Sequence, residues 1–422
     1  MRVLIEIHEG HIVRNFLENG LLERLTERGA VVMVVTPGAR VPTFVKRFER
    51  EGAAFADLGL ITYRPRSRVE VYDFALGKWL CARGLNRLRR WSWRYLAEPR
   101  AAREGTRENA LLDQWKPDVV VSTHLSQVYG RRLIATAHRR GIPTLGNLNS
   151  WDNVWKGLWV RPEVITCWSE HNREEICTFA GYQPEQVKVI GAPAFDAYFA
   201  PDGMWTRAEL CARLGLDPAR PILLFATLGQ FSQQIDETNP FEALLRALDQ
   251  GLIPGNPQIV LRMHTWSKDI YFKHLMSHPA VTLSRFETYV PGLTWTPTRD
   301  EVILLGNLMR HADVVISPGS TISIEPAAFD TPTLVPVFNE YMPEVYESYF
   351  RQTWLNQHFG RLVKHDWVPL ARTPESMVEM INWALTDRSW YREGRTHIRE
   401  QILGPLDGKA TERFVESLWA LK

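Results

Sequence analysis

Short runs of apolar, often β-branched residues alternate along the chain with longer segments in which apolar side chains recur every three or four positions. The first pattern is typical of buried strands and the second of amphipathic helices. In the first half we expect a helix over about 11–28, and strands at 3–7, 30–36, 118–123, 143–146, 165–168 and 187–190. Strands and helices that alternate in this way predict a parallel α/β architecture.

The strand pattern restarts after a linker that is rich in proline and glycine, at 197–218. Further strands are expected at 221–226, 258–262, 313–317 and 333–337, with amphipathic helices over about 376–421. The fold class that we predict is therefore α/β, with two Rossmann-like doubly wound domains at 1–196 and 219–390 that face a central cleft. Residues 391–422 are expected to pack back toward the N-terminal domain. Ligands of such sheets bind at the carboxyl ends of the strands.

Composition narrows the class of protein but does not select a function. A net charge of +2 over 422 residues gives no reason to expect a nucleic-acid partner. The four cysteines form no C-x-x-C pair, which fits a reducing compartment. No run of about 18 apolar residues occurs, and the first apolar run is too short for a signal peptide. We expect a cytoplasmic protein, and the inner face of the cell membrane is a second location compatible with the sequence.

The segment from Ser317 to Pro332 carries the strongest indication of a ligand. A predicted strand ends in a turn of small residues, Gly319, Ser320 and Thr321, and a helix is expected to follow. Backbone N–H groups at a helix N-terminus attract phosphate, and the hydroxyls, Ser323 included, add donors. Glu325 lies one turn further on, where a carboxylate can accept both hydroxyls of a ribose. The alternative is that Ser320 only caps the helix and Glu325 only favours its first turn.

This segment, with the residues from His311 to Thr333 around it, resembles the donor-binding element of GT-B glycosyltransferases. It is also similar to the element in non-hydrolysing nucleotide-sugar epimerases and in the glycerophosphotransferases of teichoic acid synthesis. In those families the Ser/Thr turn takes the donor phosphates and the acidic residue takes the ribose. The resemblance implies the same roles here for Gly319, Ser320, Thr321 and Glu325.

A second candidate element, Val260 to Trp266, follows a predicted strand. Arg262 can place its guanidinium fork on phosphate oxygens, and His264 can donate to a leaving phosphate. The element resembles the Arg-Pro-His-Pro element of polyol-phosphate transferases, although both prolines are missing here. The alternative for His264 is an ordinary histidine at a strand end.

The loop over residues 147–157 combines an aromatic residue, a carboxylate, an amide and a lysine: Trp151, Asp152, Asn153 and Lys156. It resembles a Ser-Trp-Asp-Asn…Lys-Gly loop of uncharacterised bacterial GT-B proteins, which also share segments like 168–175 and 191–196. We expect Asp152 to take part in catalysis, Trp151 to stack on a sugar or base, and Asn153 and Lys156 to contact an acceptor. The alternative is a plain Asx turn.

A cluster of titratable residues follows the first strand: His8, Glu9 and His11, with Asn15 one turn later. In the GT-B enzymes that this chain resembles, the turn after the first strand often supplies a general base or an acceptor contact, and a base with a pKa near neutrality suits removal of a hydroxyl proton. We expect His11 or Glu9 to be that base, and His8 and Asn15 to contact an acceptor. The alternatives are that His11 caps the first helix and Asn15 is an ordinary surface residue.

The segment over residues 78–103 is basic, with eight Lys/Arg and one acidic residue. One helical face carries arginines at 83, 87, 90 and 94, and the other carries Leu85, Leu88, Trp91 and Tyr95. A basic amphipathic helix with aromatics can lie on an anionic membrane. The alternative is a helix packed on the core with a solvated positive face.

Several motifs are absent: a D-x-D pair, a G-x-x-x-x-G-K-[ST] loop, a G-x-G-x-x-G turn and a G-x-S-x-G elbow. The resemblance to GT-B enzymes implies a glycosyltransferase, and the absence of these motifs favours one that needs no metal or cofactor. It would move a sugar from a nucleotide-diphosphate or CMP-linked donor to a glycan or lipid-linked hydroxyl acceptor in surface-glycan or glycolipid synthesis. The alternatives are a CDP-alcohol polyol-phosphate transferase, a nucleotide-sugar epimerase, and a non-catalytic protein that binds glycan or nucleotide.

Overall fold

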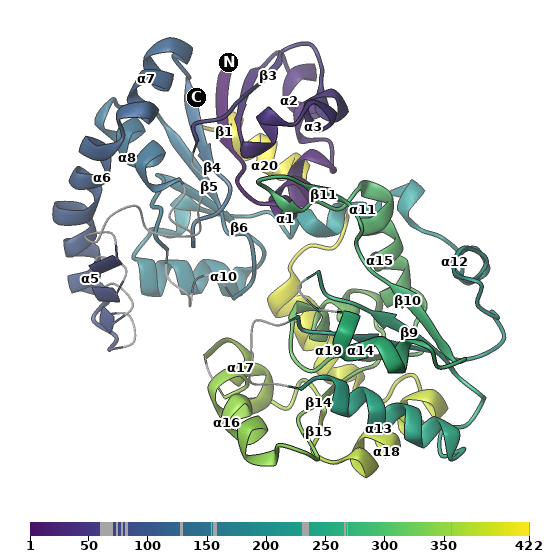
Figure 1. The fold of residues 1–422 in the computed structure, drawn as a ribbon. Helices are drawn as coiled ribbons and strands as arrows, with labels where there is room; N and C mark the ends of the chain where they lie inside the picture. The colour runs from purple at the N-terminus through teal and green to yellow at the C-terminus, as the bar shows by residue number, and fades with distance from the viewer. Residues whose placement is uncertain are drawn as a thin grey trace. The chain divides into compact units, whose positions relative to one another are not determined.

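The structure is a computed structural model that describes residues 1–59, 71–72, 75–76, 79–80, 83–126, 130–152, 154, 158–229, 236–265, 267, 269–355 and 357–421. The chain divides into two compact units (Figure 1). The first unit comprises Met1–Phe199, Thr288–Arg299 and Gln401–Lys422, and the second comprises Ala200–Glu287 and Asp300–Glu400. The strand pattern does not anticipate the excursion of 288–299 into the first unit.

The first unit is built on a seven-stranded sheet in the order β3-β2-β1-β4-β5-β6-β7, with all neighbours parallel. The strands are β1 (Arg2–Glu6), β2 (Val31–Val35), β3 (Ala53–Ala56), β4 (Val119–Ser122), β5 (Thr144–Asn147), β6 (Val164–Cys167) and β7 (Val187–Val189). The central strands are continuous apolar runs because helices cover both faces of a parallel sheet. Six of the seven strands were predicted, and only β3, a short run of alanines and one phenylalanine, was missed.

The α-helices of the first unit are α1 (Gly10–Ile12), α2 (Leu21–Glu27), α3 (Pro42–Phe48), α5 (Asn86–Ser92), α6 (Glu98–Glu104), α7 (Thr106–Trp115), α8 (Arg131–Arg139), α10 (Glu170–Glu175), α11 (Asp196–Phe199) and α20 (Ala410–Trp419). The helix predicted over 11–28 is therefore interrupted. A π-helical turn occupies Val13–Leu17, and Gly20 adopts a left-handed conformation with φ of 74°. Glycine enters that conformation without a steric penalty, which ends the first helical segment and starts α2.

The C-terminal helix α20 packs in the first unit. The carboxylate of Asp196 accepts hydrogen bonds from the backbone N–H groups of Ala410 (2.9 Å) and Thr411 (2.7 Å), at the start of the helix. These N–H groups have no partner inside the helix, so the buried carboxylate satisfies them. The ring of Phe414 lies 4.8 Å from that of Phe16, which joins α20 to the same apolar core as β1 and β2.

A two-stranded antiparallel hairpin, β11 (Tyr289–Val290) and β12 (Thr294–Trp295), also belongs to the first unit. Its turn residue Leu293 is fully buried in the core of this unit, and the carbonyl of Leu293 accepts a 2.7 Å hydrogen bond from Gly10 N–H. The hairpin therefore packs on the turn that follows β1.

The second unit contains a six-stranded parallel sheet in the order β10-β9-β8-β13-β14-β15. Its strands are β8 (Ile222–Ala226), β9 (Gln258–Arg262), β10 (Val281–Ser284), β13 (Val314–Ile316), β14 (Thr333–Pro336) and β15 (Leu370–Ala371). Its α-helices are α12 (Arg207–Leu214), α13 (Thr238–Asp249), α14 (Asp269–Met276), α15 (Arg299–His311), α16 (Pro343–Thr353), α17 (Gln357–Lys364), α18 (Pro374–Thr386) and α19 (Arg392–Ile398). All four strands predicted for this half are present.

The prediction of a helix after Ser317 is wrong in its type. Two short 3₁₀ segments, Thr321–Ser323 and Glu325–Phe329, take the place of an α-helix. Pro326 has no N–H to donate to the carbonyl four residues earlier, so an α-helix cannot continue through it. The full helix dipole that we expected behind the turn is therefore missing.

Candidate functional site

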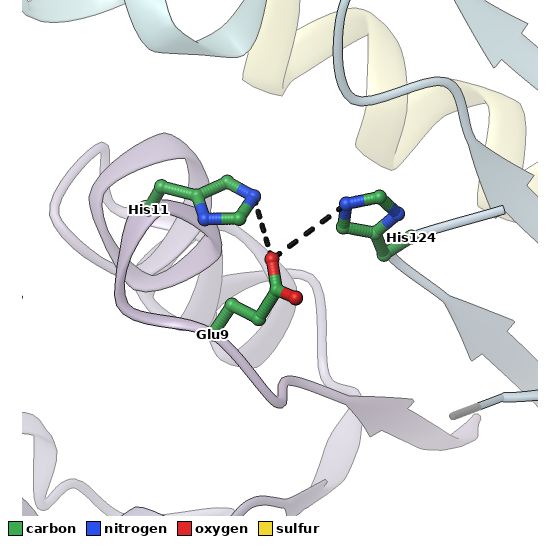
Figure 2. Close-up of side chains that lie close together, drawn as sticks. All are labelled: Glu9, His11 and His124. Carbon is green, nitrogen blue, oxygen red and sulfur yellow. Dashed lines mark ion pairs between the residues drawn. The ribbon is translucent and has the colours of Figure 1, made fainter. Parts of the chain in front are cut away.

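In the first sheet, the strands up to β3 are added on one side of β1, and the strands from β4 onward are added on its other side. β1 and β4 are therefore neighbours in the sheet, although more than a hundred residues separate them in the chain. Such a switch point leaves a crevice at the carboxyl ends of the two strands, where doubly wound proteins bind ligands. Glu9 and His11 follow β1, and His124 follows β4. The topology brings these three side chains together (Figure 2).

The carboxylate of Glu9 lies between the two imidazoles. Its Oε2 atom is 3.0 Å from Nε2 of His11 and 3.6 Å from Nε2 of His124. The two rings meet edge to face, with centroids 5.6 Å apart. Glu9 and His124 are buried, whereas 23% of the His11 side chain is exposed. His11 is therefore the member of the cluster that a small molecule can reach.

The charge state of Glu9 follows from its neighbours. Burial alone raises the pKa of this carboxyl group, but the charge of His11, its hydrogen bond and the charges of His124 and His8 outweigh burial and lower the pKa to about 2. Glu9 is therefore ionised at neutral pH. Its Oε1 atom is buried and has no hydrogen-bond partner among the described residues.

The hairpin β11–β12 shapes one side of this cluster. The ring of Trp295 stacks on His11, with centroids 6.2 Å apart and an interplanar angle of 27°. The guanidinium of Arg14 lies 5.7 Å from the centre of the same indole. The stacking restricts rotation of the His11 imidazole, which keeps its Nε2 atom directed at Glu9.

A second pair of a histidine and a carboxylate lies beside the first. Nε2 of His8 is 2.8 Å from Oε2 of Glu6, and the other oxygen of Glu6 accepts a 2.5 Å hydrogen bond from the hydroxyl of Ser122. His8 is buried in this contact. This burial argues against the acceptor contact that we expected from His8, since its side chain is turned to Glu6.

The arrangement of Glu9 and His11 suits proton transfer. When Nε2 of His11 donates to the carboxylate, Nδ1 has an available lone pair, and it makes no hydrogen bond among the described residues. A carboxylate behind a histidine fixes its tautomer and stabilises its protonated form. The donor atoms of Glu9, His11 and His124 also lie within 4.8 Å of one another, close enough to hold a divalent metal ion. The predicted independence from metal therefore stays a prediction.

The other candidates of the first unit are less accessible than we expected. The side-chain amide of Asn15 is buried and donates a 2.7 Å hydrogen bond to Oδ1 of Asn149. Trp151 is only 3% exposed, which argues against the predicted stacking of its ring on a sugar or base. Asp152 is also buried, which argues against its predicted part in catalysis. Asn153 and Lys156 lie outside the described residues.

In the second unit the switch point lies between β8 and β13, and the predicted phosphate turn directly follows β13. Gly319 has φ of 130°, and the indole of Trp354 packs so closely on it that a Cβ atom would clash. The hydroxyls of Ser317 and Ser323 are buried and have no hydrogen-bond partner among the described residues. Ser320, Thr321 and Glu325 are each partly exposed. The turn thus retains unused hydroxyl groups despite the missing α-helix.

Arg262 and His264, predicted to neutralise the leaving group, have distinct environments. Arg262 is buried, donates a 2.9 Å hydrogen bond to the Ser284 hydroxyl, and stacks over the Phe286 ring at 3.9 Å. Burial, with a smaller contribution from Arg262, lowers the pKa of His264 to about 4. His264 is therefore neutral at pH 7: it can donate one hydrogen bond to a phosphate oxygen but adds no positive charge.

Glu237 is a candidate that the sequence did not reveal. Its carboxylate accepts a hydrogen bond from the backbone N–H of Leu228, just after β8, and lies 3.4 Å from the hydroxyl of Ser267. Burial, the largest influence, raises the pKa of Glu237 to about 7. A perturbed carboxyl group at the ends of sheet strands is often functional. In the sequence it is one acid beside another, Asp236, in a polar stretch before a helix.

Comparison of the whole chain with solved structures identifies the fold. A UDP-GlcNAc 2-epimerase from Neisseria meningitidis, bound to UDP-GlcNAc, matches with a TM-score of 0.62 at 12% identity, over 100% of both chains. The chain has the GT-B fold. The UDP-GlcNAc 2-epimerase from Methanocaldococcus jannaschii matches with a TM-score of 0.58 at 12% identity, again over 100% of both chains.

A glycosyltransferase from Rickettsia africae matches this GT-B chain with a TM-score of 0.54 at 10% identity, over 100% of this chain and 98% of the other. No protein-family model matches, and no curated protein matches the sequence. The predicted α/β class with two Rossmann-like domains is confirmed. The predicted similarity in fold to nucleotide-sugar epimerases and glycosyltransferases is also confirmed.

Proposed function

We propose that this chain is an enzyme that acts on a nucleotide sugar, with Glu9 and His11 as its proton-transfer pair. The observation that carries the proposal is the 3.0 Å contact between a buried, ionised carboxylate and a partly exposed imidazole at the switch point of the first sheet. The second unit, with the turn from Ser317 to Thr321, is assigned the nucleotide. A GT-B fold supports this division of roles because the matched epimerases and glycosyltransferase share it.

In this proposal, His11 removes a proton from the sugar or from an acceptor hydroxyl. Glu9 stabilises the imidazolium that forms, and His124 holds Glu9 from the other side. A well-placed general base of this kind contributes a rate factor of roughly 10² to 10⁴. Neutral His264 and the hydroxyls of the turn after β13 are candidates to donate hydrogen bonds to the phosphates.

Epimerisation is the reaction that the comparisons favour, since the two most similar structures described above are both UDP-GlcNAc 2-epimerases. Inversion at a sugar carbon needs a group that takes a proton from one face, and a second group that returns one to the other face. His11, the partly exposed imidazole of the cluster, fits the first of these roles. This reaction needs no acceptor.

Glycosyl transfer is the second candidate. It also needs a base, here for the acceptor hydroxyl, and the similarity in fold includes one glycosyltransferase. A specific observation in its favour is an apolar stripe on α5 (Asn86–Ser92) and the π-helical turn after it in the first unit, where Leu88, Trp91 and Tyr95 are all exposed to solvent. A surface of this kind suits an enzyme whose acceptor is carried by a lipid.

One experiment separates these reactions. The protein is incubated in D₂O with UDP-GlcNAc and, in parallel, with other UDP-, GDP-, CMP-, CDP- and dTDP-linked sugars, and the products are followed by NMR. An epimerase converts the nucleotide sugar without any acceptor and places deuterium on the inverted carbon. A transferase leaves the nucleotide sugar unchanged until an acceptor is added, and then forms a glycosidic bond.

Two further outcomes have a defined meaning. A phosphodiester product from a CDP-alcohol would identify a polyol-phosphate transferase, in which case the nucleotide-sugar proposal is wrong. Absence of both binding and turnover with every nucleotide sugar tested, with and without acceptors, would support a non-catalytic binding protein instead. Glu9→Gln in the same assay shows whether any turnover depends on the proposed pair.

A further inference from the structure

Helix α5 and the π-helical turn after it, Trp93–Ala97, carry an exposed apolar surface. No residue of α5 is buried. Leu88 is 49% exposed, Trp91 52% and Tyr95 59%, and Leu85 and Leu96 are also exposed. We call the five residues Leu85, Leu88, Trp91, Tyr95 and Leu96 the α5 stripe. Large apolar side chains that are this exposed and grouped on one short segment are typical of a surface that binds another protein, a membrane or a ligand.

The opposite side of this segment is fixed to the first unit, so the stripe is held outward. The guanidinium of Arg89 donates a 3.0 Å hydrogen bond to the carbonyl of Leu158. The guanidinium of Arg131, a fully buried residue, lies 5.1 Å from the centre of the Trp93 ring. The alternative of a helix whose apolar face packs on the core therefore does not hold, since Arg89 and Trp93 make these contacts while Leu88, Trp91 and Tyr95 are exposed.

The stripe is accompanied by positive charge. Arg83, Arg87 and Arg94 are exposed, and none of them forms an ion pair with a carboxylate within the described part of the chain. No acidic residue occurs between positions 83 and 97. Arginines that have no carboxylate partner among the described residues, beside exposed tryptophan and tyrosine, match the surface of an anionic membrane, whose phosphates pair with arginine and whose interface favours aromatic rings.

A groove of about 1200 Å³ in the first unit adjoins this surface. Trp91, Arg94 and Tyr95 line one part of it, and Arg139 and Arg161 line another. The groove is open, and its charged lining consists of five arginines and His138 against Glu98 and Glu163, so it can accept phosphate groups that lie next to an apolar layer.

We propose that the α5 stripe and its arginines bind the surface of a membrane that contains anionic lipids, with the apolar side chains in the interface and the arginines on the lipid phosphates. The contact is peripheral, and the described residues contain no helix long and apolar enough to cross a membrane. The proposal does not depend on the reaction that the protein catalyses. It concerns where the first unit is held, whichever substrate the protein uses.

The test is co-sedimentation of the full chain with vesicles of phosphatidylcholine alone and of phosphatidylcholine with about one-third phosphatidylglycerol. We expect binding to the second kind only, and weaker binding as the salt concentration rises. Arg87→Gln with Arg94→Gln should reduce the partition coefficient about fivefold for each charge removed. Trp91→Ala with Tyr95→Ala should reduce it by roughly tenfold or more, while keeping good helix formers in α5.

Trp383→Ala is the matched control, because Trp383 is equally exposed (51%) but lies on α18 of the second unit. It should bind vesicles as the wild type does. Equal binding to both kinds of vesicle, no binding, or an effect of Trp383→Ala as large as that of the stripe variants would overturn the proposal. Sedimentation velocity tests whether the stripe binds a second copy of the chain instead. A wild-type dimer that Trp91→Ala dissociates would assign the stripe to a dimer interface and overturn the membrane contact.

Discussion

The backbone of Gly10 lies directly against the carbonyl of Trp295, so closely that a Cβ atom at position 10 would overlap the carbonyl oxygen. Two segments that are almost three hundred residues apart in the chain therefore share one side of the candidate site. Gly10 separates Glu9 from His11, and Trp295 stacks on His11. The small size of residue 10 is what allows the hairpin to approach the proton-transfer pair.

This contact predicts the effect of Gly10→Ala. In an ordinary helical turn the change is favourable by about 0.5–1 kcal/mol, because alanine loses less conformational freedom. Here the added methyl group must displace the hairpin or the turn, and overpacking of this kind costs about 1–3 kcal/mol or more. We expect a lower melting temperature and reduced turnover, measured by calorimetry and by the nucleotide-sugar assay. A variant that melts higher than the wild type would contradict the packing described.

The sequence predicted the central strands of both sheets because they are continuous, largely β-branched apolar runs, but it missed the edge strands β3, β10 and β15. It also singled out Glu9 and His11, which lie two residues apart in the sequence and follow the first strand. His124 was not predicted, since its place beside Glu9 depends on the pairing of β1 with β4. Trp295 was missed for the same reason, because only the tertiary packing of its hairpin brings it onto His11.

The sequence was least reliable where burial decides the role of a polar or aromatic residue. Trp151 and Asn15 stand in segments with a functional pattern, yet both side chains are buried. Leu88 and Trp91 have the spacing of a core-facing stripe, yet both are exposed. The periodicity of a sequence shows which residues share one face of a helix. Whether that face is buried or exposed depends on segments from other parts of the chain.

Asp196 should stabilise the attachment of α20 to the first unit. Asp196→Ala leaves the N–H groups of Ala410 and Thr411 without their buried acceptor, and loss of such a cap costs about 0.5–2 kcal/mol. We expect faster amide hydrogen exchange in α20 and a lower melting temperature. Asp196→Asn, which keeps an acceptor oxygen, should have a smaller effect. Unchanged exchange in α20 for Asp196→Ala would show that the carboxylate does not hold the helix.

Glu237 should make the stability of the protein depend on pH above pH 4.5. Burial raises its pKa from 4.5 to about 7, so between these values the folded chain keeps a proton that the unfolded chain has released. Stability therefore falls as the pH rises through this window, by roughly 3 kcal/mol for this group.

Glu237→Gln removes this titration and keeps an oxygen for the N–H of Leu228. Relative to the wild type, the variant should become more stable between pH 5 and pH 8, as measured by chemical denaturation at about these two values. Parallel pH profiles for the two proteins would mean that the Glu237 carboxyl group is not perturbed by burial.

The nucleotide binding that we propose for the second unit can be tested by thermal shift. A nucleotide present at about 100 times its Kd adds about 2.7 kcal/mol to the stability of the form that binds it. Glu325→Ala should weaken the response to nucleotides that contain ribose, since Glu325 is partly exposed one turn after the phosphate turn. A full response in the variant would remove Glu325 from the ribose contact.

The central claim, that Glu9 and His11 form the proton-transfer pair, is tested most directly by turnover with and without each partner. With the substrate identified in the D₂O experiment, Glu9→Gln and His11→Gln should each lower kcat by roughly 10²–10⁴, while the thermal shift with the nucleotide stays as in the wild type. His171→Gln is the matched control, since His171 forms a comparable 3.2 Å pair with Glu175 away from the site.

That control should keep wild-type kcat, and EDTA should leave the wild-type rate unchanged if the cluster works without a metal ion. Wild-type kcat in His11→Gln would contradict the account.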